Sequence, residues 1–153
     1  MTVYLVRHAR AGSRGRWKGD DALRPLSKPG RAQAAEIAKR LAKEPIDLVV
    51  SSPYVRCVAT VEPLAARLGI AVETSEALAE GARLSQSLPL FEKVQDREAV
   101  LCTHGDVMQD LLEHFARHGV ELRDHRMEKG SIWVFDVGDA GVERARYVAP
   151  PTT

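Results

Sequence analysis

The sequence is poor in cysteine and in aromatic residues, and it contains no long apolar run. Its 2 cysteines cannot build a disulfide framework, and Cys102, which lies in the apolar run 99–102, is expected to be a core thiol. No segment approaches the length of a membrane-spanning helix, and the first residues lack the apolar region of a signal peptide. We therefore expect a cytoplasmic protein that does not associate with membranes.

The chain also has almost no excess of charge of either sign. Its 22 lysines and arginines nearly balance 21 aspartates and glutamates, so the net charge is +1. This balance argues against a nucleic-acid partner, which would require an excess of basic residues. The length of 153 residues and the hydrophobic content of 44% fit a single domain over residues 1–153 with a sizeable core.

Strand and helix patterns alternate along the chain. Short apolar runs predict strands at residues 2–6, 46–50, 70–73 and 98–103. Periodic apolar positions predict helices at 27–43, 54–68 and 106–117 and a short helix at 88–95, while 75–87 reads as a loop with helical pieces. Residues 131–148 have the pattern of a β-hairpin with its turn at 138–141. This order predicts an α/β domain with a mostly parallel sheet, whose last strands are antiparallel and lie at an edge.

Three residues indicate how the first two helices begin, bend and end. Ser27 is a suitable N-cap for the first helix, because its hydroxyl can accept a hydrogen bond from the first turn. Gly69 is expected to end the second helix. Pro63 lies inside that helix and predicts a kink or a break there, since proline has no backbone N–H to donate.

Polar residues follow three of the predicted strands, at the point where each strand ends. These are Arg7-His8, Ser51-Ser52-Pro53 with Arg56 shortly after, and Thr103-His104-Gly105. If the strands are neighbours in a parallel sheet, their carboxyl ends share one crevice, which is where open α/β sheets bind ligands. Two guanidiniums and two imidazoles in one crevice indicate an anionic substrate, and a neutral imidazole can act as a nucleophile. Together these residues suggest phosphoryl transfer to a histidine.

Four segments, in the same order along the chain, resemble the histidine phosphatase superfamily, also called phosphoglycerate-mutase-like. The segments are Leu5-Val6-Arg7-His8-Ala9, Arg24-Pro25-Leu26-Ser27 with Gly30 and Gln33, Ser51-Ser52-Pro53 with Arg56 and Thr60, and Thr103-His104-Gly105. The length and the Arg-Pro-Leu-Ser segment are similar to short bacterial phosphohistidine phosphatases. Residues 10–27 also resemble the phosphatase domain that is fused to some actinobacterial Nudix hydrolases. The resemblance implies a three-layer sandwich with helices on both faces of the sheet.

The resemblance also implies a role for individual residues. His8 matches the nucleophile that becomes phosphohistidine, and Arg7 and Arg56 match the two arginines that clamp the phosphoryl group. His104 matches the second histidine, which donates to a phosphoryl oxygen. Glu80 is the candidate general acid, although a solvated loop carboxylate is the alternative for this residue. The family needs no metal or other cofactor, so none is expected.

The segment between the first strand and the first helix is rich in basic residues and includes an aromatic side chain. Arg10, Ser13, Trp17 and Arg24 are therefore candidates for substrate binding, as parts of a lid that holds an anion and stacks a base. The alternative is a flexible charged loop. The expected substrate is a phosphorylated small molecule, a nucleotide or a phosphoprotein.

Other functions remain open at this point. A phosphate- or nucleotide-binding regulatory module with little turnover is the main alternative, and a phosphoryl mutase is a weaker one because the chain has little material for the insertions that mutases carry. His114 and His118 are four residues apart, as in metal-binding pairs on one helix, but a polar helix face explains them as well. The sequence does not indicate the oligomeric state.

Overall fold

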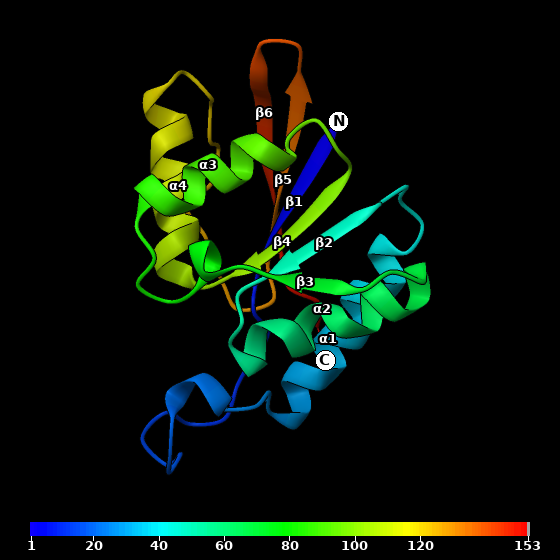
Figure 1. Ribbon diagram of the computed structural model, residues 1–153, viewed down its shortest axis with the longest axis vertical. Coiled ribbons are helices and arrows are strands. Elements are labelled where there is room, and N and C mark those ends of the chain that lie inside the picture. The colour runs from blue at the N-terminus through cyan, green and yellow to red at the C-terminus, as the bar shows by residue number, and fades with distance from the viewer. Residues whose placement is uncertain (153) are drawn as a thin grey trace.

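The computed structural model, which describes residues 1–152, has a six-stranded sheet at its centre with helices on both faces (Figure 1). The strands lie in the order β3-β2-β4-β1-β5-β6. β1 (Thr2–Arg7), β2 (Leu48–Ser51), β3 (Val72–Thr74) and β4 (Ala99–Thr103) are parallel to one another, and β5 (Ile132–Gly138) and β6 (Gly141–Val148) are antiparallel. The predicted α/β fold with a mostly parallel sheet is confirmed.

Alternate side chains of β1 point to opposite faces of the sheet and so connect two separate apolar cores. Tyr4 and Val6 pack in the core beneath α1 (Lys28–Leu41) and α2 (Val55–Leu68). Val3 and Leu5 pack in the core beneath α3 (Leu84–Val94) and α4 (Gly105–Arg117). All four side chains are buried, since each strand at the centre of the sheet is covered by helices on both sides. The result is the three-layer arrangement that the family resemblance implies.

The helix ends follow the local signals in the sequence, with one correction. Ser27 is the N-cap of α1 and its hydroxyl accepts a hydrogen bond from the Gly30 N–H at 3.2 Å. Gly69 ends α2 in a left-handed conformation, with φ of 70°. Of the kink or break expected at Pro63, the break is wrong, because α2 is continuous from Val55 to Leu68. The apolar stripe of this helix, which packs against the sheet, outweighs the loss of one backbone hydrogen bond.

The segment 75–87 is more ordered than the sequence predicts. It forms a 3-10 helix, η2 (Glu76–Leu78), and the first turn of α3, which begins at Leu84 rather than at 88. The missed signal is Gln86, whose side chain accepts a hydrogen bond from the Arg83 N–H at 3.0 Å, as in half of a capping box. The third strand also lies slightly later than expected, at Val72–Thr74.

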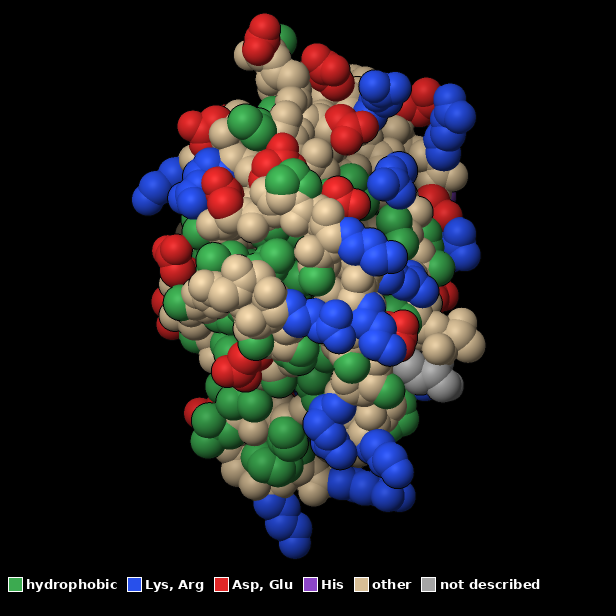
Figure 2. All heavy atoms as spheres, turned by 90° about the vertical axis from the view of Figure 1, so that its right-hand side faces the viewer, with side chains coloured by type: hydrophobic (Ala, Val, Ile, Leu, Met, Phe, Trp, Pro, Cys, Tyr) green, Lys and Arg blue, Asp and Glu red, His purple; other side chains and the backbone are tan. Residues whose placement is uncertain are grey.

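The β-hairpin at the end of the chain is confirmed, but only one of its strands is an edge. β5 lies between β1 and β6, so β6 and the short β3 form the two edges of the sheet. No helix in the described part of the chain is long and apolar enough to cross a membrane, and a cytoplasmic location stays a prediction. On the face shown in Figure 2, acidic and basic side chains are mixed in the upper part, whereas basic side chains gather along the lower right.

Gly30 is required where the first turn of α1 touches the loop after β1. A Cβ atom at this position would lie 1.8 Å from the carbonyl oxygen of Arg10, which is a backbone atom. The substitution Gly30→Ala should therefore destabilise the protein by about 1–3 kcal/mol, even though alanine favours a helix over glycine by about 1 kcal/mol. Urea denaturation would measure this loss. Gly15→Ala is the control, because only the Ser13 hydroxyl, at 3.9 Å, lies near its added methyl group; equal stability of the two variants would contradict the prediction.

Candidate active site

The carboxyl ends of β1, β4 and β2 bring the polar segments of the sequence together. β4 pairs with both β1 and β2, so the residues that follow these three strands share one edge of the sheet. A cavity of about 430 Å³ opens at this edge. Its lining includes Arg7, His8 and His104 from the strand ends, and also Ser13, Arg14, Arg24, Glu80, Asp106 and Lys129.

His8 is buried at the cavity with one ring nitrogen held and the other free. Its Nδ1 lies 2.8 Å from the carbonyl oxygen of Ala9, an acceptor, so Nδ1 carries the proton and Nε2 has its lone pair available. Burial above all, and then the neighbouring His104, Arg56 and Arg7, lower the pKa of His8 to about 3, against the effect of the Ala9 hydrogen bond. The imidazole is therefore neutral at physiological pH, as a nucleophile must be.

His104 faces His8 and has the opposite arrangement of its ring nitrogens. The two ring centroids are 5.4 Å apart. The Nε2 atom of His104 lies 2.9 Å from the Ser52 hydroxyl, which in turn accepts a hydrogen bond from the Tyr54 N–H. A hydroxyl can both donate and accept, so the Ser52 hydroxyl can donate to Nε2, and in that tautomer the proton of His104 is on Nδ1. Nδ1 is buried and has no partner among the described residues, so in this tautomer its N–H is available to an anion.

Two arginines, the half-buried Arg7 and the buried Arg56, supply further N–H groups without protein partners. Arg7 donates through Nη1 to the Met127 carbonyl, and Arg56 is fully buried, but the Nε of each lacks a hydrogen-bond partner in the described part of the chain. Gly105 allows this placement, since a Cβ there would lie only 3.0 Å from the Arg7 guanidinium carbon. Unsatisfied buried donors are costly. Arg7 lines the cavity, which indicates that an anion binds there, whereas Arg56 lies behind Asp21 and Glu80 and is not among the lining residues.

The hydroxyl of Thr60 and the amide of Gln33 connect the elements that carry the site. The Thr60 hydroxyl accepts from the Ala9 N–H at 2.9 Å and donates to the Arg56 carbonyl at 2.7 Å, so it couples the turn after His8 to α2. The Gln33 side chain accepts from the Arg10 N–H at 3.0 Å and donates to the Lys129 carbonyl at 3.4 Å. Thr60 and Gln33, which the sequence analysis named only as parts of the family segments, therefore hold the loop after β1 in place.

Two carboxylates from distant segments engage the guanidiniums on one side of the cavity. Asp21 lies in the 3-10 helix η1 (Asp21–Leu23), and its side chain accepts from Arg24 at 2.9 Å and from Arg56 at 3.1 Å. Glu80 accepts from Arg14 at 2.9 Å and from Arg56 at 3.3 Å. Hydrogen bonds from Arg24 and the charges of Arg56, Arg24 and Arg14 lower the pKa of Asp21 despite some desolvation. In this arrangement both carboxylates are acceptors.

The structure divides the predicted substrate-binding loop into two groups. Ser13 and Arg24 line the cavity, whereas Arg10 and Trp17 do not. Arg10 contributes through its backbone, whose carbonyl accepts from Ser27, while its side chain is exposed. The indole N–H of Trp17 donates to the Asp20 carbonyl and its ring is 38% exposed, so the proposed base-stacking role has no support from the cavity.

The cavity is also lined by three charged residues that were not among the candidates: Arg14, Asp106 and Lys129. Asp106 lies in the first turn of α4, where a carboxylate is favourable, and it also accepts from the Gly81 N–H at 2.8 Å and so holds the loop that carries Glu80. Lys129 gave no signal, because it belongs to a stretch without strand or helix periodicity.

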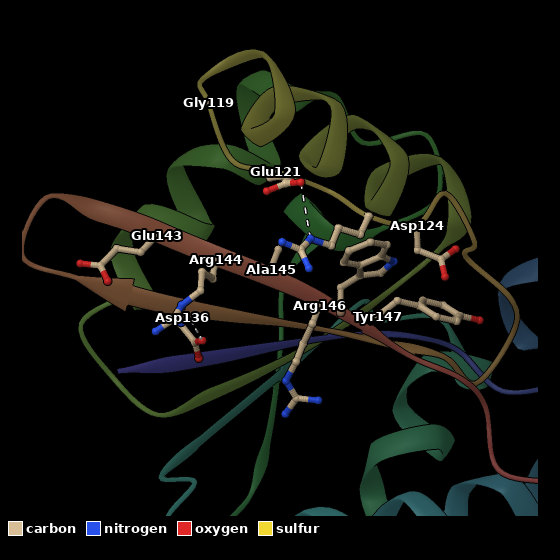
Figure 3. Close-up of a pocket in the computed structure, with 11 residues that line it drawn as sticks. Gly119, Glu121, Asp124, Asp136, Glu143, Arg144, Ala145, Arg146 and Tyr147 are labelled. Atoms are coloured by element: carbon tan, nitrogen blue, oxygen red, sulfur yellow. Dashed lines mark ion pairs between the residues drawn. The ribbon is translucent and has the colours of Figure 1, made fainter.

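A larger hollow, of about 740 Å³, lies over the β5–β6 hairpin (Figure 3). It lacks the nucleophilic side chains of the cavity at His8. Its charged side chains pair with one another, as in Glu121 with Arg123 and Asp136 with Arg144. No histidine or cysteine lines it. His114 and His118 also form no site: their rings are 4.2 Å apart, but the described residues contain no group of three potential metal ligands.

Comparisons with known proteins agree with this geometry. The chain matches the family described as histidine phosphatase superfamily (branch 1) over residues 3–84. It is 36% identical to an 8-oxo-(d)GTP phosphatase of Mycolicibacterium smegmatis, over 98% of this chain but 48% of that protein. An uncharacterised protein of Mycobacterium tuberculosis is 47% identical over 37% of this chain and 28% of its own length. The chain thus spans about half or less of the curated relatives that it matches.

Solved structures share the fold at lower sequence identity. A complex of the protein histidine phosphatase SixA with tungstate superposes with a TM-score of 0.76 at 17% identity, over 99% of this chain and 97% of that one. A mycobacterial glucosyl-3-phosphoglycerate phosphatase in complex with VO3 has a TM-score of 0.75 at 19% identity, over 99% of both chains. At this identity the likeness establishes the fold alone.

Proposed function

This chain belongs to the histidine phosphatase superfamily, and from that premise we propose that it is a phosphatase that works through phosphohistidine at His8 and needs no metal. The observation that carries the proposal is the state of His8: a neutral imidazole with a free Nε2, beside buried N–H donors that have no protein partner. This state supports His8 as the nucleophile and the free N–H donors as the groups that bind the anion.

In the proposed first step, Nε2 of His8 attacks the phosphorus atom and the bond from phosphorus to the leaving group breaks. The electron pair of that bond goes to the leaving group. Arg7, Arg56 and the Nδ1–H of His104 stabilise the charge on the phosphoryl oxygens, a role that guanidiniums can fill in place of a metal ion. In the second step, water attacks the phosphorus atom of phosphohistidine and the bond from phosphorus to Nε2 breaks. Inorganic phosphate is released and neutral His8 is restored.

Glu80 is the candidate proton donor to the leaving group, and its contacts limit when it can act. A carboxylate that accepts hydrogen bonds from Arg14 and Arg56 has to take up a proton before it can donate one. Acid catalysis matters most for a poor leaving group such as an alkoxide. The proposal therefore favours phosphoramidates, aryl esters or anhydrides over alkyl phosphates. A phosphohistidine protein, or a nucleotide cleaved at an anhydride bond, fits it better than a sugar phosphate.

The test is phosphate release in EDTA from a matched panel of substrates, with wild type and Glu80→Gln. The panel contains a phosphohistidine peptide, nucleoside phosphates, a sugar phosphate and an aryl phosphate. We expect turnover without metal, and we expect Glu80→Gln to lower the rate for alkyl phosphates by about 10²-fold but to affect the phosphohistidine peptide far less. An equal loss of rate for all substrates would show that Glu80 is not the general acid. Phosphate binding without turnover of any substrate would identify a binding module instead.

A further inference from the structure

Among the cavity cations that the proposed phosphoryl transfer does not use, Lys129 has no ion pair within the described part of the chain. The side chain of Lys129 lines the cavity, yet its ammonium group forms no ion pair or hydrogen bond with any residue that the structure describes. The neighbouring guanidiniums differ in this respect: Arg14 pairs with Glu80, and Arg24 and Arg56 pair with Asp21. Lys129 is therefore a positive charge at the cavity without a counterion from the protein.

The backbone around Lys129 is held against the strand that carries His8. The Gly130 N–H donates to the carbonyls of Arg7 and His8, at 3.1 and 3.0 Å. The Lys129 carbonyl accepts from the Gln33 side chain at 3.4 Å. The position of Lys129 beside the nucleophile is thus built by contacts from two other elements, rather than left to a free loop.

The electrostatics of this position favour an anionic ligand over an empty site. Desolvation lowers the pKa of Lys129, and the nearby cations Arg7, Arg24, Arg14 and Arg56 lower it further. An ammonium group placed among guanidiniums is repelled until an anion binds, so a ligand with a negative charge at this point relieves the repulsion.

We propose that Lys129 forms a second anion subsite, which binds a phosphate group joined by an anhydride bond to the phosphoryl group that His8 receives. The proposal rests on the phosphatase activity proposed above and names its substrate class as a diphosphate or triphosphate. Lysine binds phosphate well as a point charge. A cavity of about 430 Å³ has the size of a small-molecule site, well beyond the needs of one phosphoryl group.

The same arrangement explains how the reaction proceeds with Glu80 held in ion pairs. When Nε2 of His8 bonds to the terminal phosphorus, the bond from that phosphorus to the bridging oxygen breaks. The electron pair goes to the bridging oxygen, which becomes an oxyanion of the departing phosphate and needs no proton, since phosphate monoesters remain ionised with a second pKa of about 6. The Lys129 ammonium stabilises the charge that develops on this departing group.

The test compares a nucleoside 5′-diphosphate with the 5′-monophosphate of the same nucleoside, in EDTA. We expect Lys129→Ala to lower the ratio of their kcat/KM values by about tenfold or more, and Lys129→Arg to keep it within about threefold of wild type. Lys43→Ala is the matched control, because Lys43 is exposed and precedes β2, at the opposite edge of the sheet. An unchanged ratio in Lys129→Ala would overturn the proposal. Inorganic pyrophosphate and tripolyphosphate, run in parallel, show whether a nucleoside is also required.

A binding measurement separates failure of this subsite from failure of the phosphatase proposal. Calorimetry on the His8→Ala background would compare inorganic pyrophosphate with inorganic phosphate, with and without Lys129→Ala. A loss of affinity for pyrophosphate alone supports the subsite, even if wild type turns over no substrate. Equal losses for both anions place Lys129 at the transferred phosphoryl group and overturn the subsite. Binding of neither anion, or a phosphohistidine protein as a far better substrate than any diphosphate, also overturns it.

Discussion

Replacing His8 with alanine should abolish turnover and the phosphoenzyme together. The Nδ1 of His8 is held by the Ala9 carbonyl, so its Nε2 has a free lone pair at the cavity. Removal of a covalent nucleophile costs about 10⁴-fold or more in kcat, because the remaining groups only bind and polarise the substrate. Rapid quenching with a labelled substrate should trap an acid-labile, alkali-stable phosphoenzyme in wild type and none in His8→Ala.

The control for this variant is His125→Ala, which removes an exposed imidazole. It should keep wild-type turnover, and a thermal unfolding curve of His8→Ala should show that the fold persists without the buried ring. If His8→Ala still binds inorganic phosphate, the groups that bind the anion act independently of the nucleophile. A phosphoenzyme that survives in His8→Ala would place the nucleophile elsewhere and contradict the mechanism.

The core of the site was predictable because it depends on the ends of buried strands. An apolar run followed at once by Arg7-His8 or by His104 has few alternatives: the strand is buried, and the next side chains emerge at its carboxyl end. The pairing of β4 with both β1 and β2 then brings these ends together. For the same reason, the fold class and most element bounds followed from the sequence.

The remainder of the site depends on contacts that no local pattern signals. Asp21 and Arg56 are 35 residues apart, and their pairing follows from how the loop after β1 folds back over the start of α2. Lys129 reaches the cavity because Gly130 bonds to the backbone of Arg7 and His8. Trp17 was expected in the substrate site because it is aromatic and lies among arginines, but the local turn directs its N–H to Asp20. Charge and composition indicate such a loop without giving its path.

Replacing Arg56 with lysine should lower kcat by about 10²-fold or more, although the positive charge is kept. Arg56 is fully buried and uses its planar fork to reach two partners at once: Nη1 donates to the Asp21 carbonyl at 2.9 Å, and Nη2 contacts the carboxylates of Asp21 and Glu80. A lysine ammonium has no such fork and cannot reproduce this set. Arg67→Lys, an exposed change on the same helix, is the matched control. A kcat within about threefold of wild type for Arg56→Lys would contradict the prediction.

The carboxylates around Arg56 determine how this loss should divide between binding and catalysis. In the structure, Asp21 and Glu80 occupy its Nη atoms, while its Nε is free and buried. An incoming phosphoryl group must therefore share Arg56 with two carboxylates or displace them. It competes with them for Arg56 most strongly in the transition state, where the phosphoryl charge is most spread. Ground-state binding gains little from this exchange, so kcat should fall more than KM rises in Arg56→Lys. A rise in KM alone would mean that Arg56 holds the substrate and the transition state equally.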